Sequence, residues 1–172
     1  MHPQMQHTFA GYLQTFLSKI SDVHIQTFLT SHSAHIANTM DFSNIRYAQK
    51  TKRGVIYKDL GAFGAEDSEN MDFIKKYLTL SRCDLFFADK VIFVEGASER
   101  LLVPDMIEKC DKLELFAPIT YKLPAQYYAL IEIGGAYAYK FIPFVRFLGI
   151  PCLIITDIDA MKDGRTKSVV SK

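Results

Sequence analysis

Four acidic side chains follow two apolar segments that have the length of buried β-strands. They are Glu95, Glu99, Asp157 and Asp159. Carboxylates gathered in one place repel each other unless cations neutralise them, and oxygen-only ligand sets suit Mg²⁺, Mn²⁺ or Ca²⁺ rather than zinc. Two such metals about 4 Å apart stabilise the attacking and leaving oxygens of a phosphodiester displacement. The alternative is that these acids are solvated or cap helices, as single acids at strand ends usually are.

The elements around the acids predict where they meet. We expect strands at Lys90–Val94, Tyr128–Ile133 and Cys152–Thr156, alternating with helices at Ser98–Lys109 and Phe141–Leu148. Apolar strands separated by helices are typical of an α/β fold with a parallel sheet covered on both faces. Ligands of such sheets bind beyond the carboxyl ends of the strands, so the acids are expected in one crevice. Gly96 is expected to permit the sharp turn from strand to helix.

Other interpretations of the Asp-Ile-Asp pattern fit less well. A calcium EF-hand loop needs a third ligand and a glycine where Met161 and Lys162 stand. A haloacid-dehalogenase-type phosphatase needs Thr or Val at the position of Met161. A response-regulator phosphoacceptor remains open, but it leaves Glu95 and Glu99 without a role.

The first half of the chain has a different pattern. Apolar residues three or four apart predict an amphipathic helix over Pro3–Ile20. We further expect a strand over His24–Thr30, a hairpin of Ile45–Gln49 and Val55–Lys58, a linker over Gly61–Ser68 and a helix over Glu69–Cys83.

Composition narrows the class of protein. The chain has 172 residues, with 20 Lys and Arg against 19 Asp and Glu, so its net charge of +1 excludes a histone-like protein. No apolar run reaches the length of a membrane span, and the first residues lack the layout of a signal peptide. The three cysteines have no CxxC spacing, so we expect buried apolar side chains and a reducing, cytoplasmic location.

Several blocks of the sequence resemble a known family. Val91–Glu99 (VIFVEGASE) and Ile154–Asp159 (IITDID) resemble the two signature blocks of the TOPRIM (topoisomerase–primase) fold. The wider blocks Cys83–Leu102, Ile131–Lys140 (IEIGGAYAYK) and Phe147–Asp159 resemble the OLD (overcoming lysogenisation defect) family of ATP-dependent endonucleases. In that family a TOPRIM domain follows an ABC-type ATPase.

The resemblance implies a site and a domain order. The catalytic, metal-binding acids would be the four named above, with Mg²⁺ or Mn²⁺ in a two-metal site, and Gly96 and Gly134 would shape it. Residues 1–60 would be part of an ABC-type ATPase lobe, with the helix after Walker B and a switch strand whose His32 senses the γ-phosphate. Residues 61–82 would be a linker and connecting helix. Residues 83–172 would be a TOPRIM nuclease domain that continues beyond the chain.

The implied function is that of a metal-dependent endonuclease module that hydrolyses or nicks DNA. No GxxxxGK[ST] phosphate loop or Walker B acid is present, so we expect ATP to act only in a full-length relative. The implied partners are DNA, a second copy bound through ATPase-derived elements, and an accessory helicase or defence partner, without a membrane. The alternatives are a non-catalytic remnant or interaction module, and a small stand-alone TOPRIM protein.

Overall fold

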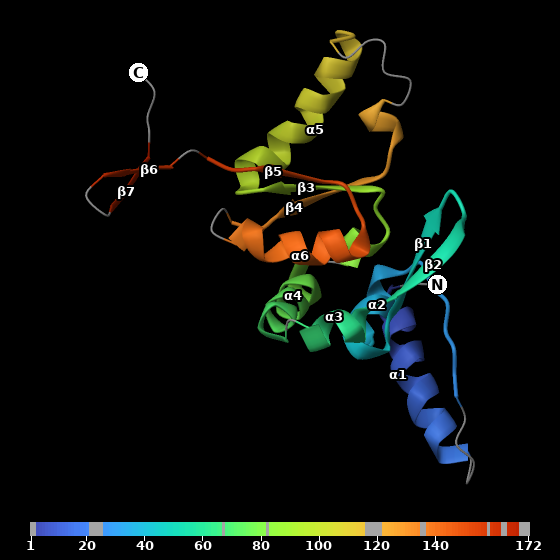
Figure 1. Cartoon of the computed structure of the whole chain (residues 1–172). Helices are drawn as coiled ribbons and strands as arrows, with labels where there is room; N and C mark the ends of the chain where they lie inside the picture. Colours follow the sequence, from blue (N-terminus) through green and yellow to red (C-terminus); the bar gives the residue numbers. More distant parts are fainter. Residues whose placement is uncertain are drawn as a thin grey trace. The chain divides into compact units, whose positions relative to one another are not determined.

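A computed structural model describes residues 3–20, 26–66, 68–81, 83–115, 122–134, 137–157, 159–162 and 165–168. The chain divides into two compact units, Met1–Phe87 and Ala88–Lys172. Figure 1 shows the elements of both units along the chain. We describe each unit by itself.

The first unit contains helices and one hairpin. Its elements are α1 (Pro3–Ile20), α2 (Ala34–Thr39), η1 (Phe42–Asn44), β1 (Arg46–Thr51), β2 (Gly54–Asp59), α3 (Leu60–Glu66), α4 (Ser68–Ser81) and η2 (Cys83–Phe86). The helix predicted at the start of the chain and the predicted hairpin are thus confirmed. Among the helices of the described residues, none combines the length and the apolar character that a membrane crossing requires.

Two predictions for this unit are wrong. Residues 26–33 have no regular secondary structure, so the strand predicted up to Thr30 is absent there, while His24 and Ile25 lie outside the described residues. The predicted linker is helical, because α3 begins at Leu60. The Asp59 carboxylate accepts a hydrogen bond from the Gly61 N–H at 2.8 Å, and the side chains of Leu60 and Phe63 are buried. Burial of these two apolar side chains outweighs the low helix propensity of the glycines.

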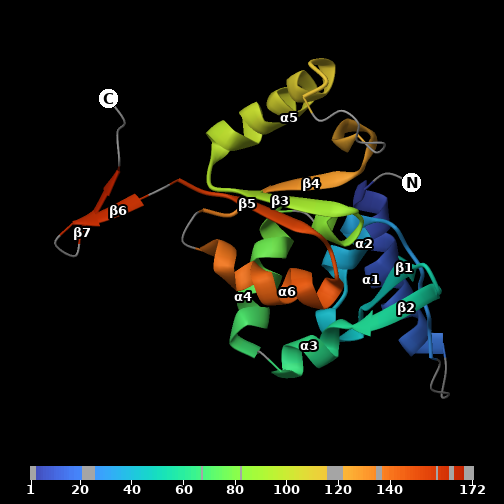
Figure 2. The same cartoon turned by 45° about the horizontal axis from the view of Figure 1, so that its top comes forward.

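The second unit is built around a parallel sheet. Its elements are β3 (Lys90–Val94), α5 (Ala97–Lys112), η3 (Leu123–Ala125), β4 (Tyr128–Glu132), α6 (Ala138–Leu148), β5 (Cys152–Ile155), β6 (Asp159–Lys162) and β7 (Arg165–Ser168). The strand order is β4-β3-β5, and β3 is parallel to both neighbours. Figures 1 and 2 show α5 on one face of this sheet and α6 on the other. The predicted α/β fold, with a parallel sheet flanked by helices, is confirmed.

The central strand β3 is buried on both faces. Ile92 and Val94 pack with Val103 on the α5 side. Phe93 points to the opposite face, where the centroid of its ring lies 5.2 Å from the ring centroid of Phe141 on α6. Successive side chains of a strand point to opposite faces, so a strand covered by two helices must be apolar throughout. This double burial fixes the end of β3, where Glu95 follows.

Strand β5 lies at an edge of the three-stranded sheet, and the prediction of buried cysteines fails there. Cys152 is exposed and Cys110 is half-buried, while the side chain of Cys83 lies outside the described residues. An edge strand has a neighbour on one side only, which leaves Cys152 and Leu153 accessible. Partial desolvation still raises the pKa of the Cys152 thiol, so the thiol stays protonated at neutral pH.

Candidate metal centre

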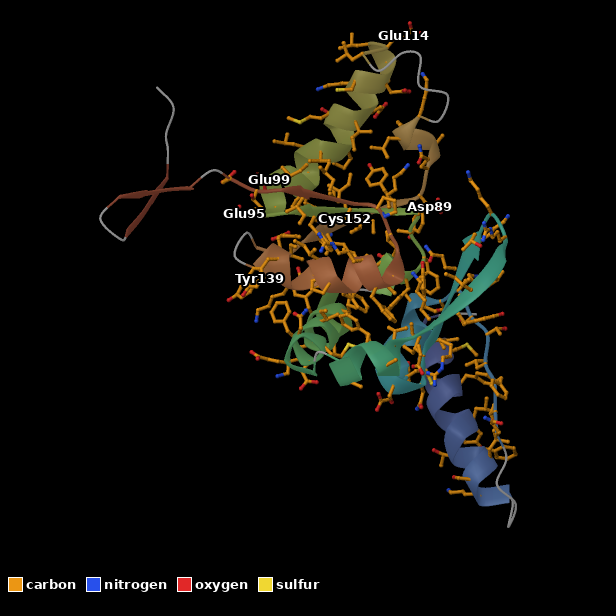
Figure 3. The ribbon with its side chains drawn as sticks, in the orientation of Figure 1. Asp89, Glu95, Glu99, Glu114, Tyr139 and Cys152 are labelled. Carbon is orange, nitrogen blue, oxygen red and sulfur yellow. The ribbon has the colours of Figure 1, made fainter. Side chains whose placement is uncertain are left out.

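The ends of all three parallel strands meet at Glu95. The Asp157 N–H, just beyond β5, donates a hydrogen bond to the Glu95 carboxylate at 3.0 Å. The Gly134 N–H, just beyond β4, donates to the Glu95 carbonyl oxygen at 3.1 Å. Figure 3 shows Glu95 and Glu99 at one end of the sheet and Asp89 at the other. The structure therefore brings the two acid-bearing strand ends together at the carboxyl edge of the sheet.

Glu99 caps the helix that follows β3. Its Oε2 atom accepts a hydrogen bond from the Gly96 N–H at 2.9 Å, in a capping box at the start of α5. A carboxylate at this position also interacts favourably with the positive end of the helix dipole. The helix-capping alternative for this acid is thus found in the structure, and it uses one of the two carboxylate oxygens.

The expected need for glycine at position 96 does not come from the backbone. Gly96 has φ −144° and ψ −174°, which is extended backbone that any residue adopts. An added Cβ would have the Glu99 Oε2 as its nearest neighbour, at 3.4 Å. The turn from strand to helix is stabilised by the capping box, and a side chain at position 96 would make an ordinary van der Waals contact with the Glu99 carboxylate.

Gly134 does require glycine for its backbone. Its φ of +58° is left-handed, a region that L side chains rarely adopt. We expect Gly134→Ala to lower the free energy of unfolding by about 1 kcal/mol, because alanine at a positive φ is strained. Urea unfolding followed by circular dichroism measures this difference. Gly11→Ala is the matched control because an added Cβ meets no atom within 4 Å there, and equal losses for the two variants would contradict the assignment.

The two aspartates of the Asp-Ile-Asp pattern lie in different elements. Asp157 is exposed just beyond β5, whereas Asp159 begins β6, which pairs with β7 in a separate antiparallel hairpin. The side chain of Asp159 and all of Ile158 lie outside the described residues. Among the described residues, no three His, Cys, Asp or Glu side chains are close enough together to hold a metal ion.

The donor chemistry at Glu95 fits a hard divalent cation. The atoms available at this edge are carboxylate oxygens, and Mg²⁺ and Mn²⁺ prefer oxygen ligands. The Glu95 carboxylate has one hydrogen-bond donor within the described part of the chain, the Asp157 N–H. Because a carboxylate has about four acceptor sites, this bond orients Glu95 and leaves it able to accept further partners.

A fifth acid, Glu132, lies at the same edge of the sheet, and it is not among the four acids that the sequence predicts to bind metal. Glu132 ends β4, opposite Val94 in the register, and its carboxylate lies 3.9 Å from Arg100 of α5. Both side chains are well exposed, so this ion pair contributes little to stability. The sequence pattern that indicates Glu132 is an acid at the end of an apolar strand, which is also the pattern of Glu95 after β3.

His32 lies in the first unit, in the irregular segment that precedes α2. Its side chain is exposed. The neighbouring Ser33 N–H donates a hydrogen bond to the Ser31 hydroxyl at 3.0 Å, which gives the segment a local turn. The structure thus describes an accessible imidazole at this position.

A parallel sheet between two helices, with a glutamate directly after its central strand, is consistent with a TOPRIM-type α/β domain. Residues 86–159 match the family model described as "Overcoming lysogenization defect protein-like, TOPRIM domain". Residues 86–159 are therefore a TOPRIM domain of the OLD-like family.

Two curated relatives extend this similarity along the chain. The chain is 30% identical over 187 residues to "Endonuclease GajA" of Bacillus cereus (strain HuB5-5), which covers 97% of this chain and 26% of that protein. It is 25% identical over 142 residues to "Endonuclease GajA" of Bacillus cereus (strain VD045), covering 83% of this chain and 22% of that protein. The chain thus spans about a quarter of the length of these relatives.

Proposed function

We propose that this chain supplies the metal-dependent DNA endonuclease module of an OLD-type ATP-dependent endonuclease. The observation that carries the proposal is the hydrogen bond from the Asp157 N–H to the Glu95 carboxylate, which joins the two acid-bearing strand ends. The TOPRIM match over residues 86–159 and the two relatives named as endonucleases support it. The reaction is the hydrolysis or nicking of DNA phosphodiester bonds.

The residues that would hold the metal ions are Glu95, Glu99, Asp157 and Asp159. Two bound Mg²⁺ or Mn²⁺ ions supply activation of water and neutralisation of the charge that develops on the phosphate. The chain's own contribution is orientation. The Asp157 N–H fixes the Glu95 carboxylate, and the Gly134 N–H holds the Glu95 backbone against the end of β4. Such preorganisation removes the cost of moving charged groups during the reaction.

Metal binding by Glu99 would cost the hydrogen bond that this side chain makes at the start of α5. One of its oxygens accepts the Gly96 N–H, so a cation that engages both oxygens would replace this hydrogen bond. A capping interaction of this kind is worth about 1 kcal/mol. A divalent cation held by the proposed carboxylates would have to offset that cost through its attraction to their negative charge.

Binding of Mn²⁺ is expected to stabilise the chain against unfolding. At a hundredfold excess over its Kd, a ligand that binds only the folded state raises the free energy of unfolding by about 2.7 kcal/mol. Thermal unfolding followed by circular dichroism at increasing Mn²⁺ concentrations measures the shift. The double variant Glu95→Gln/Asp157→Asn keeps the size of both side chains and is expected to lose the shift. A wild-type chain that does not respond to Mn²⁺ would contradict the proposed metal site.

The wider assignments belong to the same proposal. ATP would act in a longer relative that carries a phosphate loop, with the accessible His32 as the residue that senses the γ-phosphate. In such a relative, the ATPase-derived elements of residues 1–60 would join two copies, and an accessory helicase or defence partner would bind the assembly. The proposed location is the cytoplasm.

A further inference from the structure

The positive charge of the chain is concentrated in the β1–β2 hairpin. Within Arg46–Asp59 there are five of the chain's 20 cationic residues and one of its 19 acidic residues. Because the whole chain has a net charge of +1, the rest of it is net acidic. A two-stranded hairpin with this charge has a local field that attracts anions, whatever the net charge of the chain.

One face of the hairpin packs against its own unit. Tyr47 lies on the half-buried side of β1, and its ring centroid is 6.3 Å from the ring centroid of Phe86. Lys58 is directly opposite Tyr47 in the register and is also half-buried, and desolvation lowers the pKa of its ammonium group. This inner face therefore anchors the hairpin to the first unit.

The outer face of the hairpin is exposed, and it carries Lys50 and the aromatic ring of Tyr57. Lys50 pairs with Val55 and Ala48 pairs with Tyr57, so these four side chains share one face. Tyr57 is 74% exposed and Val55 is 55% exposed. A tyrosine beside cations suits a surface that binds duplex DNA, because tyrosine is among the side chains that contact the sugar–phosphate backbone.

The cations at the tip have no acidic partner among the described residues. Arg46 pairs with Asp59 at 2.9 Å, at the base of the hairpin. Lys50, Lys52 and Arg53 are exposed, and no ion pair to any of them is found within the described part of the chain. In Figure 1 the tip extends away from α2 and α3. The tip can therefore approach a large anionic surface without first breaking a salt bridge.

We propose that the outer face and tip of the β1–β2 hairpin bind the phosphate backbone of duplex DNA, through Lys50, Lys52 and Arg53 and with Tyr57 beside them. The choice of DNA as the polyanion rests on the proposed function. The contact is independent of sequence, because lysine and arginine recognise phosphates by charge. A two-stranded ribbon also has dimensions that the major groove admits.

The test is a binding measurement that needs no catalysis. A short fluorescein-labelled duplex is titrated with the full chain in EDTA at several KCl concentrations, and anisotropy gives Kd. For Lys50→Gln/Lys52→Gln/Arg53→Gln we expect a salt slope smaller by about 3, and with it an affinity loss of roughly 10² to 10³-fold near 0.1 M KCl that shrinks as the salt concentration rises. The matched control is Lys109→Gln/Lys112→Gln/Lys122→Gln, which removes the same charge from lysines that already pair with carboxylates.

The outcomes separate this inference from the proposed function. A hairpin variant with the slope and affinity of the wild type, or a control with the same loss as the hairpin variant, overturns the inference. Circular dichroism of both variants verifies that the substitutions leave the fold intact. Hairpin-dependent binding without Mg²⁺- or Mn²⁺-dependent cleavage would instead contradict the proposed function and leave the inference standing.

Discussion

Replacing Glu95 with glutamine is expected to reduce Mg²⁺-dependent nicking of supercoiled DNA by roughly 10² to 10³-fold, with little effect on stability. The amide oxygen of the introduced glutamine can still accept the hydrogen bond from the Asp157 N–H, which holds the strand ends together. What is lost is the negative charge that the proposed site needs to bind a divalent cation. The substitution therefore separates the structural role of Glu95 from its proposed chemical role.

The measurement is the rate at which supercoiled plasmid becomes relaxed or linear with Mg²⁺, Mn²⁺ or EDTA. Glu114→Gln is the matched control, because this acid lies at the far end of α5 from Glu95 and Glu99 (Figure 3). It removes the same charge from the same domain. Asp157→Ala is expected to abolish nicking as well, since the proposed site loses a carboxylate. Nicking at the wild-type rate by both Glu95→Gln and Asp157→Ala would contradict the proposed assignment.

The sequence predicts the fold well where one physical signal dominates. The runs Val91–Val94 and Cys152–Ile155 are unbroken and apolar, and both are found in strands of the parallel sheet. Helix α6 ends where Gly149 adopts a left-handed φ of 72°, as glycine after a helix commonly does. These local patterns agree with the tertiary burial, so the prediction needs no knowledge of distant contacts.

The failures come from contacts between residues far apart in sequence. The segment around Gly61 contains small and polar residues typical of a linker, yet Leu60 and Phe63 are buried and the segment is helical. Cys152 follows the pattern of a buried strand, yet it lies on an edge strand. Periodicity describes the shape of an element, whereas burial depends on which neighbours the fold places beside it.

Some features of the candidate site are likewise predictable from the sequence, whereas others are not. The positions of Glu95 and Asp157 beyond adjacent parallel strands follow from the sequence, because parallel strands end at the same edge. The hydrogen bond that links them joins a backbone N–H to a carboxylate, and residue types do not encode that contact. Likewise the pattern Gly96 to Glu99 fits both a metal site and a helix cap, and only the geometry reveals the capping box.

One aromatic contact in the scaffold of the site joins Phe141 of α6 to Phe93 of the central strand. Phe141→Ala is expected to lower the free energy of unfolding by about 3 to 5 kcal/mol, because it removes a fully buried ring and leaves a cavity. Its partner Phe93 lies on β3, two residues before Glu95, so the cavity opens against the strand that holds the site. Urea unfolding followed by circular dichroism measures the loss. Tyr139→Ala is the control on the same helix, since that ring is 63% exposed.

A double-mutant cycle with Phe93→Leu tests whether the pair acts through direct contact. Rings with centroids 5.2 Å apart and tilted by 46° are expected to couple by about 0.5 to 1.5 kcal/mol. The double variant should therefore lose less stability than the two single variants together. A loss below about 1 kcal/mol for Phe141→Ala would contradict the packing of α6 on β3, because a buried phenylalanine cannot be truncated so cheaply in a close-packed core. Such a result would also mean that α6 does not hold the end of β3, and with it Glu95, in place.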